Sequence, residues 1–190
     1  MTGRVLGVGR GFGLGVLCAV VLVLVTGCST TAQQDAARSQ PVARSSSPYV
    51  DKVLVKKSER KLYLVKNGQP IRSYRVSLGT NPTGRKERQG DNRTPEGLYY
   101  LDGRNAGSRF YKALHISYPN DRDRLEAAQR GVSPGGQIMI HGQPASSRLR
   151  DLQDALRGAD WTAGCIAVTN PEMEEIWGYT TNGTPIEIVP

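Results

Sequence analysis

Alternation of apolar and polar residues is the clearest pattern in the chain. Apolar residues recur at every second position in three short runs: Val53 and Val55; Leu62 and Leu64; and Tyr74, Val76 and Leu78. This period places successive apolar side chains on one face of a strand. The pair Asn67-Gly68 between the second and third runs favours a tight hairpin turn. The pattern therefore predicts a β-hairpin preceded by a further strand.

Other segments complete the predicted fold. Further strands are expected at Leu98 to Leu101, Phe110 to Tyr118, Gln137 to His141 and Pro185 to Val189. Helices are expected at Asn120 to Arg130, at Ser146 to Arg157, and from Asn170-Pro171-Glu172, which has the capping residue, first-turn proline and acid of a helix start. The segment from Gly79 to Gly97 is too polar to be core. The predicted fold class is mostly β with a few short helices (α+β).

The N-terminal segment has a different composition. Arg4 and Arg10 precede an apolar run from Leu14 to Val25, which is too short to span a bilayer comfortably and is typical of an export signal. Val25-Thr26-Gly27-Cys28 resembles the lipobox of bacterial lipoprotein precursors. We expect a signal peptide at residues 1–27, a lipidated Cys28 with a flexible linker at 28–49, and one domain at 50–190. The alternative is an ordinary secretory signal with a chance cysteine.

Charge and cysteine content narrow the possible functions. Loss of the leader with Arg4 and Arg10 lowers the formal net charge from +8 to +6, which suits anionic surroundings such as cell-wall polymers or lipid. Nucleic acid is not an expected partner, because the chain is exported and has no recognisable recognition module. Cys165 is the only cysteine of the mature domain, so it has no disulfide partner there. It is either a buried structural cysteine or a functional thiol.

Two histidines are candidate partners for Cys165. His141 ends an apolar run and is followed by Gly142, so it is expected where a strand leaves the sheet, whereas His115 lies inside an apolar run and is expected to be structural. In a Cys–His pair, the imidazole either takes the thiol proton or lowers the thiol pKa as imidazolium. Backbone amides around Gly164 and Cys165 could donate to an oxyanion. The residues therefore indicate acyl transfer; they fall short of a metal site, and no cofactor is expected.

These residues resemble a known family. Ile140-His141-Gly142, Thr162-Ala163-Gly164-Cys165-Ile166 and Asn170 are similar to the catalytic signature of the L,D-transpeptidases, and Thr94-Pro95-Glu96-Gly97 and His115-Ile116-Ser117-Tyr118-Pro119 are similar to strings that its members carry upstream. The resemblance covers nearly all of residues 50–190. It implies a β-sandwich-like catalytic domain and an enzyme that attacks peptidoglycan stem peptides.

The resemblance also implies roles for single residues. Cys165 would be the nucleophile, His141 the general base, and Gly142 the residue whose carbonyl orients that histidine. The acyl donor in the family is a tetrapeptide stem cut after its L-centred diaminopimelate, and the acceptor is an amine of another stem, a lipoprotein lysine, or water. Trp161 and Thr162, just before the cysteine, are predicted substrate contacts. Basic residues of the polar segment could also meet stem carboxylates, although a solvated loop is favoured for them: Arg85, Lys86, Arg88 and Arg93.

The chain departs from the common family pattern at two positions. Ala163 replaces a second histidine, and Ala167 replaces an arginine that many members carry. The variant string is most similar to a branch that includes hydrolases of the bond between diaminopimelate and the lysine of an outer-membrane lipoprotein. Three hypotheses therefore stand: a transpeptidase that forms cross-links, a hydrolase with the same nucleophile, and a wall-binding lipoprotein without turnover. The expected location is a membrane facing the periplasm, reached through the lipid anchor, with the outer membrane as a candidate.

Overall fold

The computed structural model describes residues 47–144, 151 and 158–190. The chain divides into two units, Met1–Pro41 and Val42–Pro190, and the described residues all belong to the second. The expected leader, Cys28 and the helix expected at Ser146 to Arg157 lie outside the described residues, apart from Asp151 in a helical turn. No helix in the described part of the chain is both long and apolar enough to cross a membrane.

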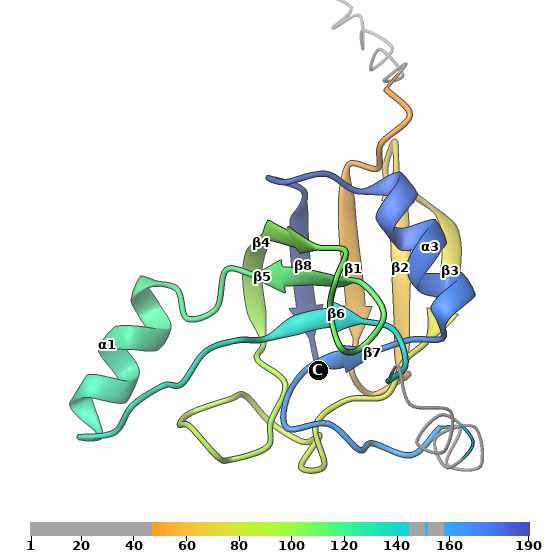
Figure 1. Ribbon diagram of the computed structural model, residues 1–190. Helices are drawn as coiled ribbons and strands as arrows, with labels where there is room; N and C mark the ends of the chain where they lie inside the picture. Colours follow the sequence, from red (N-terminus) through yellow and green to blue (C-terminus); the bar gives the residue numbers. More distant parts are fainter. Residues whose placement is uncertain (1–46, 145–150, 152–157) are drawn as a thin grey trace, which may run out of the picture. The chain divides into compact units, whose positions relative to one another are not determined.

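Eight strands form the domain, in the order β3-β2-β1-β8-β4-β5-β6-β7 (Figure 1). Their bounds are β1 Lys52–Lys56, β2 Lys61–Lys66, β3 Gln69–Arg75, β4 Gly97–Asn105, β5 Ala113–Ile116, β6 Met139–His141, β7 Ile166–Ala167 and β8 Pro185–Val189. The predicted hairpin is confirmed, because β2 and β3 pair antiparallel across Asn67-Gly68. The predicted strand before it is β1, which pairs antiparallel with β2 and parallel with β8.

Strand β4 joins two halves of the sheet. Its first part, Gly97 to Tyr100, pairs with β8, and its second part, from Leu101 to Asn105, pairs with β5 after a bulge. Bulges bend a strand, and here the sheet curls so far that the segment after β3 meets β7. Ser77 and Ala167 exchange two backbone hydrogen bonds of 2.9 Å. The predicted class, mostly β with few helices, is confirmed, and the sandwich takes the form of one curled sheet.

Alternate residues of each strand fill the core between the two halves. Val53 and Val55 of β1, Leu62 and Leu64 of β2, and Ile186 and Ile188 of β8 are buried there, together with Ile140 and Ile166 from the second half. Complete burial of such side chains stabilises the fold by about 1.5–3 kcal/mol each. In the second half, the residues between the core positions point to the opposite face of the sheet, and this outer face carries the predicted catalytic residues.

Two helices are described. Helix α1, Asp121–Gln129, lies within the range predicted for it. Its cap, Asn120, forms a reciprocal capping box with Asp123. Helix α3, Asn170–Tyr179, buries Met173 and Ile176 in the core. The expectation that Asn170 caps α3 is wrong: the cap is Thr169, whose backbone N and Oγ1 lie 2.8 Å and 2.7 Å from Glu172 Oε2.

Two predicted strands are shorter than expected. The strand predicted from Phe110 begins only at Ala113, because Tyr111 and Lys112 have positive φ angles of 33° and 50°. The strand predicted from Gln137 begins at Met139, and Gln137 has a φ of 57°. Residues in this conformation cannot continue a pleated strand. Both irregular segments lie beside the predicted catalytic residues.

Candidate active site

The strand register brings Cys165 and His141 to one face of the sheet. In the parallel pair of β6 and β7, Ile140 is opposite Ile166 and His141 is opposite Ala167. Ile140 and Ile166 point into the core, so His141 and Ala167 point to the outer face. Cys165 precedes β7 and lies two residues before Ala167, which places it on the same outer face by the period-two alternation. Two residues that are 24 positions apart in sequence thus become near neighbours.

The Cys165 thiol is half-buried and bonded to the backbone. Its Sγ lies 3.6 Å from the carbonyl oxygen of Gln137, to which the thiol donates. Burial raises the thiol pKa above its usual value; a backbone hydrogen bond from Met139 and the positive charge of Lys86 act against this rise and do not cancel it. The resting thiol is therefore protonated near neutral pH. A neighbouring base would have to take this proton before the sulfur could act as a nucleophile.

The imidazole of His141 is arranged as a base. Its Nδ1–H donates to the carbonyl oxygen of Gly142 at 2.7 Å, which leaves Nε2 as the acceptor in the neutral ring. His141 is only 4% exposed, and burial lowers its pKa below the usual range although the bond to Gly142 raises it. The rings of Phe110 and Trp161 lie 4.7 Å and 5.8 Å from the imidazole, centre to centre. The histidine therefore stays neutral and has a fixed orientation at neutral pH.

Gly142 lies at a crowded point behind His141. A Cβ atom there would lie 2.6 Å from Asn170 Oδ1 and 2.7 Å from the carbonyl oxygen of Tyr111. The Gly142 N–H donates to that Tyr111 carbonyl, and Asn170 Oδ1 accepts from the backbone N–H of Gln143. Asn170 thus joins the start of α3 to the segment after His141. Only glycine fits this position without displacement of the backbone that holds the imidazole.

The turn before Cys165 is held by Thr162. Its Oγ1 donates to the Cys165 carbonyl at 2.7 Å and accepts from the Gly164 N–H at 3.0 Å. Thr162 is 6% exposed, so its side chain supports the turn, in contrast to the expected substrate contact. The Gly164 N–H, an expected oxyanion donor, already donates to Thr162 Oγ1. The N–H of Cys165 has no acceptor among the described residues and is the better candidate.

The cysteine segment is anchored to the first half of the sheet. Asp160 accepts from the guanidinium of Arg60 and, at 2.9 Å, from the backbone N–H of Leu78. Thr162 bonds through its backbone to Leu78 and Thr80. These contacts fix the start of the turn that leads to Cys165.

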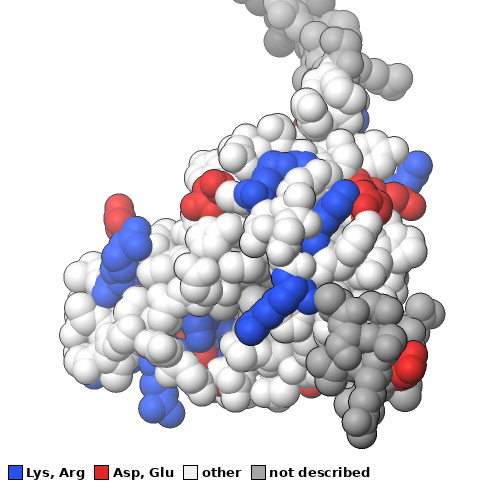
Figure 2. Space-filling view, viewed as in Figure 1, with Lys and Arg blue, Asp and Glu red and all other residues white. Residues whose placement is uncertain are grey.

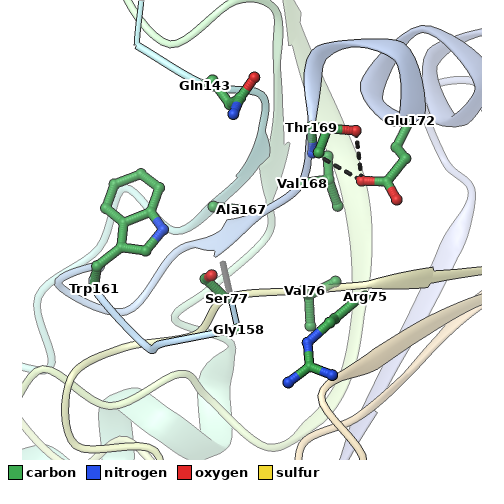
Figure 3. Close-up of a pocket in the computed structure, with 10 residues that line it drawn as sticks. All are labelled: Arg75, Val76, Ser77, Gln143, Gly158, Trp161, Ala167, Val168, Thr169 and Glu172. Atoms are coloured by element: carbon green, nitrogen blue, oxygen red, sulfur yellow. Dashed lines mark hydrogen bonds between the residues drawn. The ribbon is translucent and has the colours of Figure 1, made fainter. Parts of the chain in front are cut away.

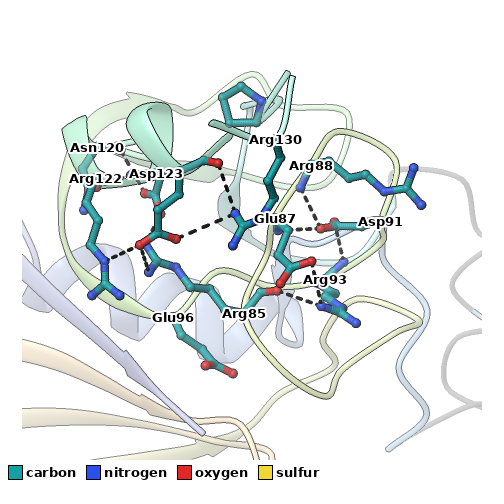
Figure 4. Close-up of polar contacts among 12 residues, drawn as sticks. Arg85, Glu87, Arg88, Asp91, Arg93, Glu96, Asn120, Arg122, Asp123 and Arg130 are labelled. Carbon is teal, nitrogen blue, oxygen red and sulfur yellow. Dashed lines mark hydrogen bonds and ion pairs between the residues drawn. The ribbon is translucent and has the colours of Figure 1, made fainter. Parts of the chain in front are cut away.

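The polar segment from Gly79 to Gly97 packs behind the cysteine. A Cβ on Gly164 would lie 2.7 Å from the carbonyl oxygen of Arg93, so glycine permits this close approach. Lys86 donates to Asp91 at 2.7 Å, and their side chains are only 3% and 8% exposed. Asp91 also accepts three backbone hydrogen bonds, from Glu87, Arg88 and Arg93 (Figure 4).

A second ion-pair cluster ties this segment to α1. Arg85 binds Asp123 at 2.5 Å and Glu126 at 3.1 Å, and Asp123 also accepts from the Tyr99 hydroxyl. The expectation of a solvated loop is therefore wrong for Lys86 and Arg85, whose charges are buried or half-buried and paired. Figure 2 shows the other basic side chains of the viewed face spread over it and not gathered in one patch.

A cavity of about 190 Å³ opens beside the site (Figure 3). Trp161 forms one wall, and Ala167, Val168 and Ser77 lie between it and Arg75 on the other side. Sequence reasoning missed Arg75 here, as it missed Phe110 against His141. No signal short of the strand pairing identifies Arg75, whereas an aromatic residue just before the predicted strand was a weak signal for Phe110.

His115 lies on the same outer face but is arranged differently. It is opposite Met139 in the sheet, and its Nδ1–H donates to the carboxylate of Asp102 at 2.5 Å. Its side chain is 29% exposed. This hydrogen bond near the surface agrees with the structural role expected for His115. Within the described ranges, no cluster of three or more His, Cys, Asp or Glu side chains is placed for a metal ion.

Comparison with known proteins identifies the family. The L,D-transpeptidase catalytic domain family (YkuD) matches residues 51–188, well over half of the chain. The chain belongs to this family. The match includes the histidine, the cysteine turn and both halves of the curled sheet, so the resemblance expected from the sequence motifs is confirmed.

Individual relatives agree with this assignment. A curated protein of Escherichia coli (strain K12), "Putative L,D-transpeptidase YafK", is 34% identical over 131 residues, which are 66% of this chain and 45% of that protein. The helical cell shape determining protein Pgp2 of Campylobacter jejuni is 27% identical with a TM-score of 0.53, over 74% of this chain and 49% of that one. Bd1075 of Bdellovibrio bacteriovorus is 25% identical with a TM-score of 0.50, over 77% and 50%. This L,D-transpeptidase domain thus spans half or less of the length of each relative.

Proposed function

We propose that the protein is a cysteine acyltransferase of peptidoglycan stem peptides, with Cys165 as the nucleophile and His141 as the general base. The observation that carries this proposal is the placement of a protonated thiol and a neutral imidazole on one face of the sheet, each oriented by a backbone carbonyl. Membership of the L,D-transpeptidase family supports the substrate class.

The geometry supports a two-step reaction. Nε2 of His141 takes the thiol proton as Sγ attacks the carbonyl carbon of the donor peptide bond, and the oxyanion lies against the Cys165 N–H. The imidazolium then gives its proton to the leaving amine, the C–N bond breaks, and a thioester on Cys165 remains. An acceptor amine attacks this thioester, His141 takes the proton of that amine, and the thiol is restored. Water in place of the amine would give hydrolysis.

Product analysis tests the proposal. Purified protein is incubated with muropeptides that carry tetrapeptide stems, and the products are identified by mass spectrometry, with the Cys165→Ala variant as control. The proposal predicts new dimers or exchanged stem termini with the wild type alone. Shortened or freed stems would instead indicate hydrolysis by the same nucleophile. Unmodified muropeptides with retained wall binding would support the lipoprotein without turnover.

We also propose that the chain is exported and lipid-anchored through Cys28 toward the periplasm. The support is the sequence alone: a basic, then apolar leader followed by Val25-Thr26-Gly27-Cys28. Metabolic labelling with an alkyne fatty acid tests this. Label is expected in the wild-type chain and not in the Cys28→Ser variant, and equal label in both would contradict the anchor.

A further inference from the structure

The cavity beside Cys165 has the position of a substrate subsite. Ala167, the strand neighbour of His141 on the outer face, lies in its wall, and Trp161, whose ring faces the imidazole, forms one side. The cavity therefore adjoins both predicted catalytic residues without containing either of them. Cys165 lies two residues before Ala167 on the same face, so a peptide in the cavity could extend along this face toward the thiol. The small side chain of Ala167 keeps this space open.

The cavity contains two charged side chains, which differ in their partners. Glu172 Oε2 is occupied by the backbone N and Oγ1 of Thr169 at the start of α3. Arg75, the last residue of β3, is exposed and has neither an ion pair nor a hydrogen bond to any residue that the structure describes. Its guanidinium lies against Gly158, where a Cβ would be 2.6 Å from Nη2. Among the described residues, Arg75 is thus a cation of the wall that is not paired with an acid, Glu172 included.

The rest of the wall defines the kind of group that fits. Val76, Val168, Ala167 and Trp161 are apolar and suit a short aliphatic body. A guanidinium binds a carboxylate through two parallel hydrogen bonds, which gives both charge and geometric complementarity. A cavity of about 190 Å³ has room for a carboxylate with a few carbon atoms.

We propose that this cavity is a carboxylate subsite, in which Arg75 binds a carboxylate of the peptide while another part of the same peptide lies at Cys165. The peptide assignment rests on the proposed function, whereas the carboxylate preference rests on the cavity alone. The carboxylate comes either from the end of a peptide or from an acidic side chain, and the experiment below distinguishes these two sources.

Thiol labelling tests the subsite without turnover. The full chain with Cys18→Ser and Cys28→Ser has Cys165 as its only thiol. It is treated with 3-maleimidopropanoate and 6-maleimidohexanoate, and with the carboxamide of each, and the ratio of the acid rate to the amide rate is measured. We expect this ratio to exceed that of free cysteine by about fivefold or more for at least one tether, as for a charge-assisted bond that stays partly exposed.

Substitutions test whether Arg75 causes the difference between the acid and amide labelling rates. Arg75→Gln should reduce the ratio to that of free cysteine, and Arg75→Lys should retain part of it. Arg72→Gln is the matched control, because Arg72 is an exposed arginine of the same strand that has its own partner, Glu175 at 3.6 Å. An equal ratio in wild type and Arg75→Gln, or an equal loss in Arg72→Gln, would overturn the proposal.

Turnover identifies the source of the carboxylate. Tetrapeptide stems are amidated either at the terminal carboxylate or at the diaminopimelate carboxylate, and KM is measured for wild type and Arg75→Gln. Amidation of the carboxylate that Arg75 binds should raise KM in the wild type and have no effect in the variant. If neither amidation depends on Arg75, the peptide assignment is wrong. If no stem is processed while the labelling ratio still depends on Arg75, the proposed function fails and the carboxylate site remains.

Discussion

Two charged regions lie beside Cys165, and their charges have different partners. In the segment from Gly79 to Gly97, Lys86 and Asp91 form a buried pair, and Arg85 is paired with α1. In the cavity next to Ala167, Arg75 has no acidic partner within the described residues. The first region packs behind the cysteine turn, and the second is the region that we propose binds a ligand. The two regions therefore differ in whether their charged side chains are paired, and not in how many charges they carry.

The largest loss of activity is expected from substitution of His141, which belongs to neither charged region. His141→Ala removes the base without disturbing either set of charges, so activity on stem peptides should fall by about 10² to 10⁴-fold. The variant should stay folded, with a lower melting temperature because a buried ring is lost. Steady-state assays with a parallel thermal melt check this. The matched variant His115→Ala alters the surface pair with Asp102 and should keep activity within about threefold of wild type; equal losses in both variants would contradict the distinction between the histidines.

Substitutions in the paired region should lower the stability of the fold. Asp91→Ala leaves Lys86 buried without its carboxylate and frees three backbone N–H groups, so the free energy of unfolding should fall by about 3 kcal/mol. Urea denaturation measures this change. Asp121→Ala, at a fully exposed acid of α1, is the control and should change the free energy by less than about 0.5 kcal/mol. Equal stability of the two variants would show that the Lys86–Asp91 pair is not a framework element.

The pH dependence should follow from the burial of His141. Because its pKa is lowered, the imidazole is neutral and active above that pKa and is protonated and inactive below it. The kcat/KM profile should therefore rise by about tenfold per pH unit on the acid side and level off below pH 6.5. An inflection above pH 6.5 that disappears in His141→Ala would show that the folded protein raises this pKa.

The Thr162→Val variant tests the role of the turn before Cys165. Thr162→Val keeps the shape of the side chain and removes the hydroxyl that bridges the Cys165 carbonyl and the Gly164 N–H. The loss should lower the free energy of unfolding by about 1–3 kcal/mol and reduce kcat more than it raises KM. Thr80→Val, at an exposed position, is the control. A rise in KM alone would favour the substrate contact that the sequence suggested.

The smallest effect on stability is expected in the unpaired region. Arg75→Gln removes a charge that has no partner among the described residues, so the free energy of unfolding should stay within about 0.5 kcal/mol of wild type. Urea denaturation of this variant and of Asp91→Ala compares the free energies of unfolding that the two regions contribute. A loss as large as that of Asp91→Ala would mean that Arg75 supports the fold, and the distinction between the regions would fail.

The sequence predicted the parts of this domain that depend on local pattern. Alternating apolar residues indicated β1 and β2 and, through Tyr74, the end of β3, whereas Val76 and Leu78 lie beyond β3. His141 and Cys165 were recognised at the ends of apolar runs. The two-residue strand β7 was missed because it is held by β6 and Ser77, which are distant in sequence. The burial of Lys86 was missed for a similar reason, since a charged residue is buried only when the tertiary structure supplies its partners.

Covalent capture of the acyl group at Cys165 tests the central claim most directly. Wild type and Cys165→Ala are mixed with a tetrapeptide stem, quenched in acid within seconds and examined by intact and peptide mass spectrometry. The account predicts an acyl thioester on Cys165 in the wild type, with neither adduct nor product in the variant. Product formation by Cys165→Ala at the wild-type rate would contradict the account.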